Sequence, residues 1–322
     1  MAVRYHFSDD PKRLGRGEQE KYDTFGRTTQ EGEAYFARRR LWHREFYGGP
    51  HFGTATDAAE PKNMYYCDIT PLPPTVKIET GESFPLPLAV IIEVINRTSH
   101  RVITRHCTCR YAFDCASYDK NIGCLHIGAA TAEEPDSVAR HVSKEEAIEF
   151  VTFAVKSGLL PFVGKMDVDN EVWGIWSGEP MFTVCLCCPC CCIPRRGYQY
   201  LHPENKPWQF HAQEGMNLKI DADRCLQSEC GSCARQCPAR ALTMVDGKLR
   251  YDKRKCIFCG RCQTVCQKSA LDIVTGDIKK LVNDLFGRLD GQCGDLGFDG
   301  QEYAESVLET AAGLTGKQAS HA

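Results

Sequence analysis

The sequence has almost no excess charge of either sign, because 39 lysines and arginines face 42 aspartates and glutamates, for a net charge of -3. A chain so balanced has no broad attraction for a phosphate backbone, and we expect no nucleic-acid partner. Long apolar runs are also missing: the longest, residues 85–92 and 181–193, fall well short of the ~18 residues that span a membrane. The first ten residues contain no apolar leader core, which predicts a cytoplasmic protein without a membrane segment of its own.

Motifs for nucleotide cofactors are absent as well. The glycine-rich stretches lack the flanking strand and helix that flavin, nicotinamide and phosphate-binding loops require. A regulatory or nucleotide-binding domain, which a redox sensor or reductive activator would need, is not found either. The remaining composition, 43% apolar and 25% charged, is that of an ordinary globular protein.

What the chain has in excess is cysteine, with 20 residues. Disulfides are rare in the reducing cytoplasm, so we interpret these thiols as metal ligands rather than as covalent pairs. Most of them fall in four short stretches. Cys67 and Cys293 stand alone, and we interpret them as structural.

The last two stretches, between residues 218 and 275, form an internal repeat. The later one has the spacing C-x2-C-x2-C-x3-C, formed by Cys256, Cys259, Cys262 and Cys266. The earlier one has two extra residues after its first cysteine and consists of Cys225, Cys230, Cys233 and Cys237. Three closely spaced thiolates can wrap one iron-sulfur cubane while the fourth reaches a second. Gly260 removes a side chain where the backbone must approach the inorganic sulfides.

These eight cysteines resemble those of bacterial-type two-cluster ferredoxins. The resemblance implies two 4Fe-4S clusters with crossed ligation. One would be held by Cys225, Cys230, Cys233 and Cys266, and the other by Cys237, Cys256, Cys259 and Cys262. Two features depart from the family: the longer 225–230 loop, and Gln267 in place of the usual proline.

Four more cysteines lie upstream with the spacing C-x-C-x5-C-x8-C, namely Cys107, Cys109, Cys115 and Cys124. They favour a further iron-sulfur centre, with structural zinc or no metal as alternatives. We interpret His106 and His126 as neighbours rather than ligands. Arg110 either offsets cluster charge or is solvated.

The densest stretch has six cysteines in eight residues: Cys185, Cys187, Cys188, Cys190, Cys191 and Cys192. No ordinary core needs so many thiols. Neighbouring side chains cannot all face one cubane, which suggests division between two centres, one of them shared with the upstream four. One or two additional clusters are therefore expected. The run is distantly similar to the cysteine-rich domains of heterodisulfide reductases, but Pro189 stands where their C-C-G element has glycine.

The pattern predicts an α+β fold, in which a ferredoxin-like dicluster module is appended to a cysteine-rich α/β N-terminal domain. The capping box of Ser143 and Glu146 predicts a helix over 144–157 that stops at Gly158. A strand is predicted at 101–105, a helix or buried strand at 86–95, and helices at 277–289 and 302–312. The predicted boundaries are an extended arm over 1–60, the cysteine-rich domain over 61–215, the module over 216–278 and a helical extension over 279–322.

The residues from about 105 to 275 also look like a group of iron-sulfur proteins of anaerobes. The leading hypothesis is an electron-transfer subunit between a low-potential carrier and the catalytic subunit of an anaerobic oxidoreductase complex, with redox proteins as partners. The alternative is a reductase whose cluster in the cysteine-rich domain, upstream of the module, acts directly on a disulfide or an activated acyl substrate. Catalytic residues are not predicted.

Overall fold

The computed structural model describes residues 67–78, 83–166, 169–177, 179–192, 194–195, 210, 212–293, 296 and 302–315. The predicted arm over 1–60 lies outside these residues, as do the side chains of Cys67 and Cys293. Helices and strands are mixed through the described chain, which confirms the α+β class.

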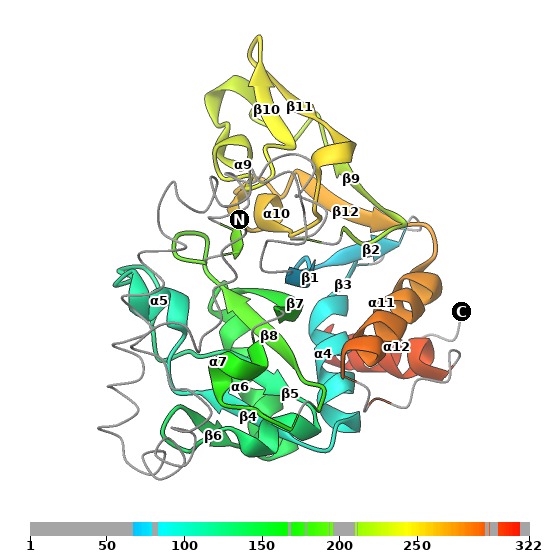
Figure 1. Ribbon diagram of the computed structural model, residues 1–322. Helices are drawn as coiled ribbons and strands as arrows, with labels where there is room; N and C mark the ends of the chain where they lie inside the picture. Colours follow the sequence, from blue (N-terminus) through cyan, green and yellow to red (C-terminus); the bar gives the residue numbers. More distant parts are fainter. Residues whose placement is uncertain are drawn as a thin grey trace, which may run out of the picture.

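An antiparallel six-stranded sheet forms the body of the protein, in the order β1-β7-β8-β5-β4-β6 (Figure 1). The predicted strand at 101–105 is its β4. The strands are β1 (Cys67–Pro71), β4 (Arg101–Thr104), β5 (Leu125–Ile127), β6 (Ala139–His141), β7 (Leu160–Met166) and β8 (Phe182–Cys187).

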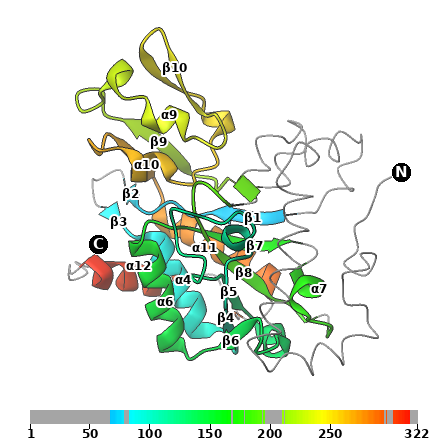
Figure 2. The same cartoon turned by 90° about the vertical axis from the view of Figure 1, so that its left-hand side faces the viewer.

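Helices α4 (Leu86–Arg97) and α6 (Lys144–Lys156) cover one face of this sheet, and α12 (Glu302–Thr315) lies beside them (Figure 2). The capping box at α6 is confirmed, because Ser143 accepts from the Glu146 amide while the Glu146 side chain accepts from the Ser143 amide. Gly158 follows with φ of +85°, as a helix stop requires. None of the helices within the described residues is long and apolar enough to cross a membrane.

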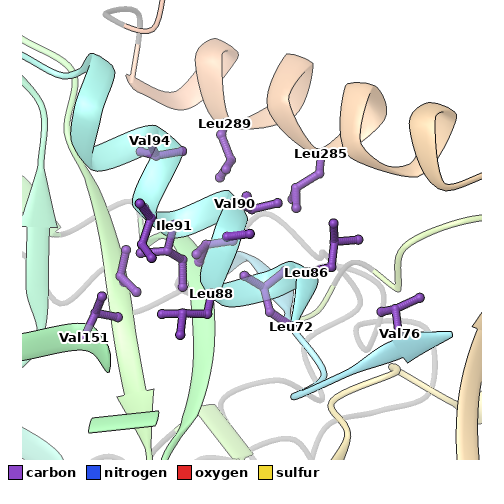
Figure 3. Close-up of a cluster of buried hydrophobic side chains, with 14 of the residues drawn as sticks. Leu72, Val76, Leu86, Leu88, Val90, Ile91, Val94, Val151, Leu285 and Leu289 are labelled. Atoms are coloured by element: carbon purple, nitrogen blue, oxygen red, sulfur yellow. The ribbon is translucent and has the colours of Figure 1, made fainter. Parts of the chain in front are cut away.

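The segment 86–95, which could be helix or strand by sequence, is the helix α4. All ten of its residues from Leu86 to Ile95 are buried, because further helices pack against it. These are α11 (Ile278–Cys293) and α12 (Glu302–Thr315). They correspond to the two helices predicted at 277–289 and 302–312. Figure 3 shows Leu285 and Leu289 of α11 directed toward Val90 and Val94 of α4. The C-terminal helices thus pack on the body of the same chain.

A second sheet joins the body to the dicluster module, the name we keep for residues 216–278. Its order is β3-β2-β12-β9, and β2 pairs parallel with β12. Body residues therefore extend the sheet of the module, and Lys77 of β2 pairs with Asp272 of β12 at 2.7 Å. The strands are β2 (Val76–Ile78), β3 (Ser83–Phe84), β9 (Met216–Ile220) and β12 (Leu271–Thr275).

The rest of the module consists of a hairpin and short helices, drawn in yellow and orange in Figure 1. The hairpin strands are β10 (Leu242–Val245) and β11 (Lys248–Tyr251), and the helices are η6 (Gln227–Glu229), α9 (Ser232–Arg235), η7 (Lys253–Lys255) and α10 (Arg261–Val265). The body has three further short helices, α5 (Thr108–Ala112), η4 (Ala129–Glu133) and α7 (Asp169–Trp173).

Candidate iron-sulfur sites

The two halves of the module place their central cysteines in the same way. Gly231 precedes α9 and Gly260 precedes α10, and the backbone of both glycines is in the left-handed region, with φ of +60° and +71°. A Cβ on Gly260 would lie 2.1 Å from Cδ of Pro74. Glycine is therefore required at 260 by contact with the body as well as by the backbone angle.

Cysteines from both halves of the module line one pocket. Its lining includes Cys225, Cys230 and Cys233 of the first half together with Cys266 of the second. Burial raises the pKa of the Cys233 thiol, and the neighbouring thiols of Cys225 and Cys266 raise it further. The amide of Ala270 donates to Sγ of Cys266 at 3.2 Å, as backbone amides do to cluster-bound thiolates. This grouping is the one that crossed ligation requires.

The other four module thiols form a second group at the boundary with the body. Burial raises the pKa of Cys262 well above its usual value, and Cys259, Cys256 and Cys237 raise it further. Burial likewise raises the pKa of Cys259 to about 11, against the opposing charge of Arg195. Cys237, from the first half, thus lies with three thiols of the second.

The pleat of β8 divides the densest cysteine run between the two faces of the body sheet. Successive side chains of a strand point to opposite faces. Val184 and Leu186 pack into the core under α4 and α6, and Cys188, next in that alternation, packs there too. Cys185 and Cys187 belong to the other face, where Cys187 packs with Phe162.

On the α4 side, four thiols meet. The Sγ atoms of Cys115, Cys188, Cys190 and Cys191 all lie within 4.8 Å of one another. Those of Cys115 and Cys190 are 3.5 Å apart, and Cys190 is exposed. Burial raises the pKa of Cys188 to about 12, so these thiols would not all ionise without a cation among them. We call this group the four-thiol site.

On the opposite face, six thiols form an unbroken chain of contacts. Cys192 lies 3.1 Å from Cys187, Sγ to Sγ. Cys187 contacts Cys185, which contacts Cys124, and Cys107 links Cys124 to Cys109. We call this group the six-thiol chain, and its members are Cys107, Cys109, Cys124, Cys185, Cys187 and Cys192.

The structure thus brings together the two cysteine stretches that precede the module, residues 107–124 and 185–192, which we call the upper cysteine stretches. The guanidinium of Arg110 lies where they meet. The side chain of Arg110 is fully buried, which rules out the solvated alternative. It donates to the carbonyls of Asp119, Ile122 and Leu186. Burial alone would lower the pKa of Arg110, yet the nearby thiols, Cys107 foremost, keep it above the usual value. This cation can therefore offset thiolate charge.

Each of the two histidines near these cysteines, His106 and His126, has a contact outside the thiol groups. His126 is buried, and its Nδ1 lies 2.8 Å from Oε1 of Glu134. His106 stacks on Tyr111, with ring centroids 5.2 Å apart. Arg195, which sequence reasoning did not single out, is buried and donates to the carbonyl of Cys188 at 3.3 Å. Nothing in the sequence distinguished it from the other arginines.

Residues 217–267 match the family model of the 4Fe-4S dicluster domain. The match covers all eight cysteines of the module and ends before β12. It shows that the chain carries an iron-sulfur domain of the ferredoxin type. Among curated proteins, none matches the chain.

Proposed function

We propose that this protein is the electron-transfer subunit of an anaerobic oxidoreductase complex, passing electrons between a low-potential carrier and a catalytic partner. One observation carries the proposal: the same chain has a dicluster domain and, in its body, further clustered thiols. Iron-sulfur clusters exchange single electrons, and the protein sets their potentials through burial, charge and hydrogen bonds. The crossed thiol groups of the module would hold two 4Fe-4S clusters.

The contact between module and body supports transfer from one to the other. Cys187 and Cys192 of the body share a buried apolar cluster with Cys259 of the module, and Cys237 packs against it. Centres held on either side of this cluster would be neighbours with no bulk water between them. Electrons entering the module could then continue into the body.

A basic recess beside this contact supports a protein partner. It is lined by Pro189 of the densest cysteine run, by Cys237 and by three arginines, Arg195, Arg235 and Arg240. None of the described residues that line it is acidic. Complementary charge accelerates the encounter of proteins, so the recess suits an acidic redox protein.

The reductase alternative has one observation in its favour. Cys190 of the four-thiol site is exposed, so a disulfide or activated acyl substrate could reach a centre there. A reductase would consume such a substrate with the isolated chain and a reduced carrier. An electron-transfer subunit would be reduced by the carrier and turn over only when its catalytic partner is added.

The experiment is an anaerobic purification from the native host, with iron, sulfide and zinc measured per chain and the co-purifying subunits identified. We expect at least eight iron atoms for the module alone, since each cubane contains four. A zinc-loaded, iron-free protein would refute the proposal. Iron-loaded protein that turns over substrates without a partner would favour the reductase.

The recess is tested by charge reversal in the iron-loaded protein. In the variant Arg235→Glu/Arg240→Glu, reduction by an acidic carrier should slow by at least about tenfold at low salt. The matched control, Lys279→Glu/Lys280→Glu on the exposed side of α11, changes net charge equally but should keep the rate. Equal slowing in both variants would mean that net charge, not this surface, governs the encounter.

A further inference from the structure

We infer that the six-thiol chain is an iron-sulfur site of its own, distinct from the four-thiol site. The inference rests on the proposed function, and deepens it by assigning the ten upper cysteines to two centres. The six-thiol site would be buried against the module, and the four-thiol site would lie at the surface.

The register of two strands builds the buried site. Leu125 of β5 pairs with Val184 of β8 in antiparallel register. Continued by one residue, this register sets Cys124 opposite Cys185, and directly opposed side chains lie on the same face of a sheet. A hydrogen bond between the two thiols agrees with that placement. The sheet thus joins the two cysteine stretches at this point.

Local structure around α5 brings the upstream thiols to the same place. The amide of Cys107 donates to the carbonyl of Lys120 at 2.8 Å, and so closes the loop that starts α5. This closure sets Cys107 beside Cys124, while Cys109 follows within the helix. Thiols from one closed loop thereby converge on thiols from one face of a strand.

The backbone of β8 separates the two sites. Cys188 lies past the end of β8 on its α4 face, whereas Cys185 and Cys187 are on the other face. The strand backbone therefore stands between the two thiol groups. Arg110 also intervenes, donating to the carbonyl of Leu186 at 2.7 Å. One cubane could not take ligands from both faces.

The ligand atoms limit which metal the buried site can hold. The six described members of the contact chain are all cysteines, and thiolates select iron-sulfur clusters, zinc or monovalent copper. Four thiolates complete a 4Fe-4S cubane, so six are sufficient. Packing against the thiols of Cys237 and Cys259 favours the redox-active choice, because a zinc ion there would interrupt the route from the module.

The experiment compares two sets of substitutions in the full chain, prepared anaerobically. Cys107→Ser/Cys124→Ser/Cys185→Ser leaves only three thiols of the six-thiol chain, fewer than the four that a cubane needs, and Cys115→Ser/Cys190→Ser leaves two of the four-thiol site. Each variant should lose about four iron atoms, and the combined variant about eight, while the signals of the module clusters persist. Full iron content in the first variant would overturn the inference. So would an equal loss in both variants and in their combination, which would indicate one shared centre.

A second measurement uses the unsubstituted protein, so its result does not depend on whether the variants fold. Cys190 is exposed, whereas the thiols of the six-thiol chain are half-buried or buried. A bulky water-soluble iron chelator should therefore remove about four iron atoms in a fast phase and leave the rest protected. A parent protein with only the eight iron atoms of the module would refute the six-thiol site but leave the proposed electron transfer intact. A module without iron would refute the proposed function itself.

Discussion

The guanidinium of Arg110 donates a 2.7 Å hydrogen bond to the carbonyl of Leu186, which is 76 residues later in the chain. Its other donors reach the carbonyls of Asp119 and Ile122, within the loop that carries the upstream cysteines. A single side chain thus ties both upper cysteine stretches together. Its charge is placed where the four-thiol site and the six-thiol chain approach each other.

Replacing Arg110 should therefore destabilise the body more than replacing an exposed arginine. Arg110→Met leaves buried carbonyls without donors, at a cost of about 3 kcal/mol or more in unfolding free energy. We expect a clear fall in the anaerobic melting temperature. Arg105 is exposed and also donates to a carbonyl, that of Asp136, so Arg105→Met is the control and should change little. Similar melting temperatures for both variants would show that the Arg110 contacts contribute no special stability.

Crossed ligation predicts which cluster a module substitution removes. Cys266→Ser should damage the cluster associated with Cys225, Cys230 and Cys233, because these four thiols line one pocket. Cys262→Ser should damage the other. Paramagnetic resonance of the reduced protein distinguishes the two losses. If both variants lost the same cluster signal, the thiols would be ligating within each half, and the crossing would be wrong.

Gly260 should tolerate no side chain. Gly260→Ala adds a Cβ within 2.1 Å of Pro74 and 2.8 Å of Pro73, at a φ of +71°. Module and body would have to separate locally, so we expect a loss of stability of more than about 2 kcal/mol and a weakened neighbouring cluster signal. Gly276→Ala meets nothing within 4 Å and is the control. An unchanged melting temperature in Gly260→Ala would contradict the close packing.

The edge of the body sheet should be sensitive to acid. Burial lowers the pKa of His100, and the neighbouring His141 and Arg101 lower it further. Below the ordinary histidine pKa of about 6.5, the unfolded chain therefore binds a proton that the folded chain resists, and stability falls as pH decreases through this range. Melting temperatures between pH 7.5 and 5.5 test this. In His100→Gln the decline should be shallower, and an equally steep decline would exclude His100 as its cause.

Local sequence patterns were sufficient to predict features that depend only on interactions between neighbouring residues. The thiol spacing of the module specified its loops, because three ligands of one cubane must lie within a few residues of one another. Ser143 and Glu146 specified the start of α6, because a capping box involves only neighbouring residues. The segment 86–95 stayed ambiguous, since α4 is buried on every side and an evenly apolar run has no period to read.

The sequence by itself determined that the chain binds iron-sulfur clusters in a module with two related halves, because that chemistry depends on cysteine spacing. Tertiary structure alone decided how the remaining thiols are divided between the four-thiol site and the six-thiol chain. The alternation of side chains along β8 sends Cys187 to one face and Cys188 to the other, and the register of β5 with β8, continued by one residue, sets Cys124 opposite Cys185. It also decided that β2 extends the sheet of the module and that Arg110 is buried. Such contacts join residues far apart in the chain, and their energies depend on surfaces that exist only once the sheets have formed.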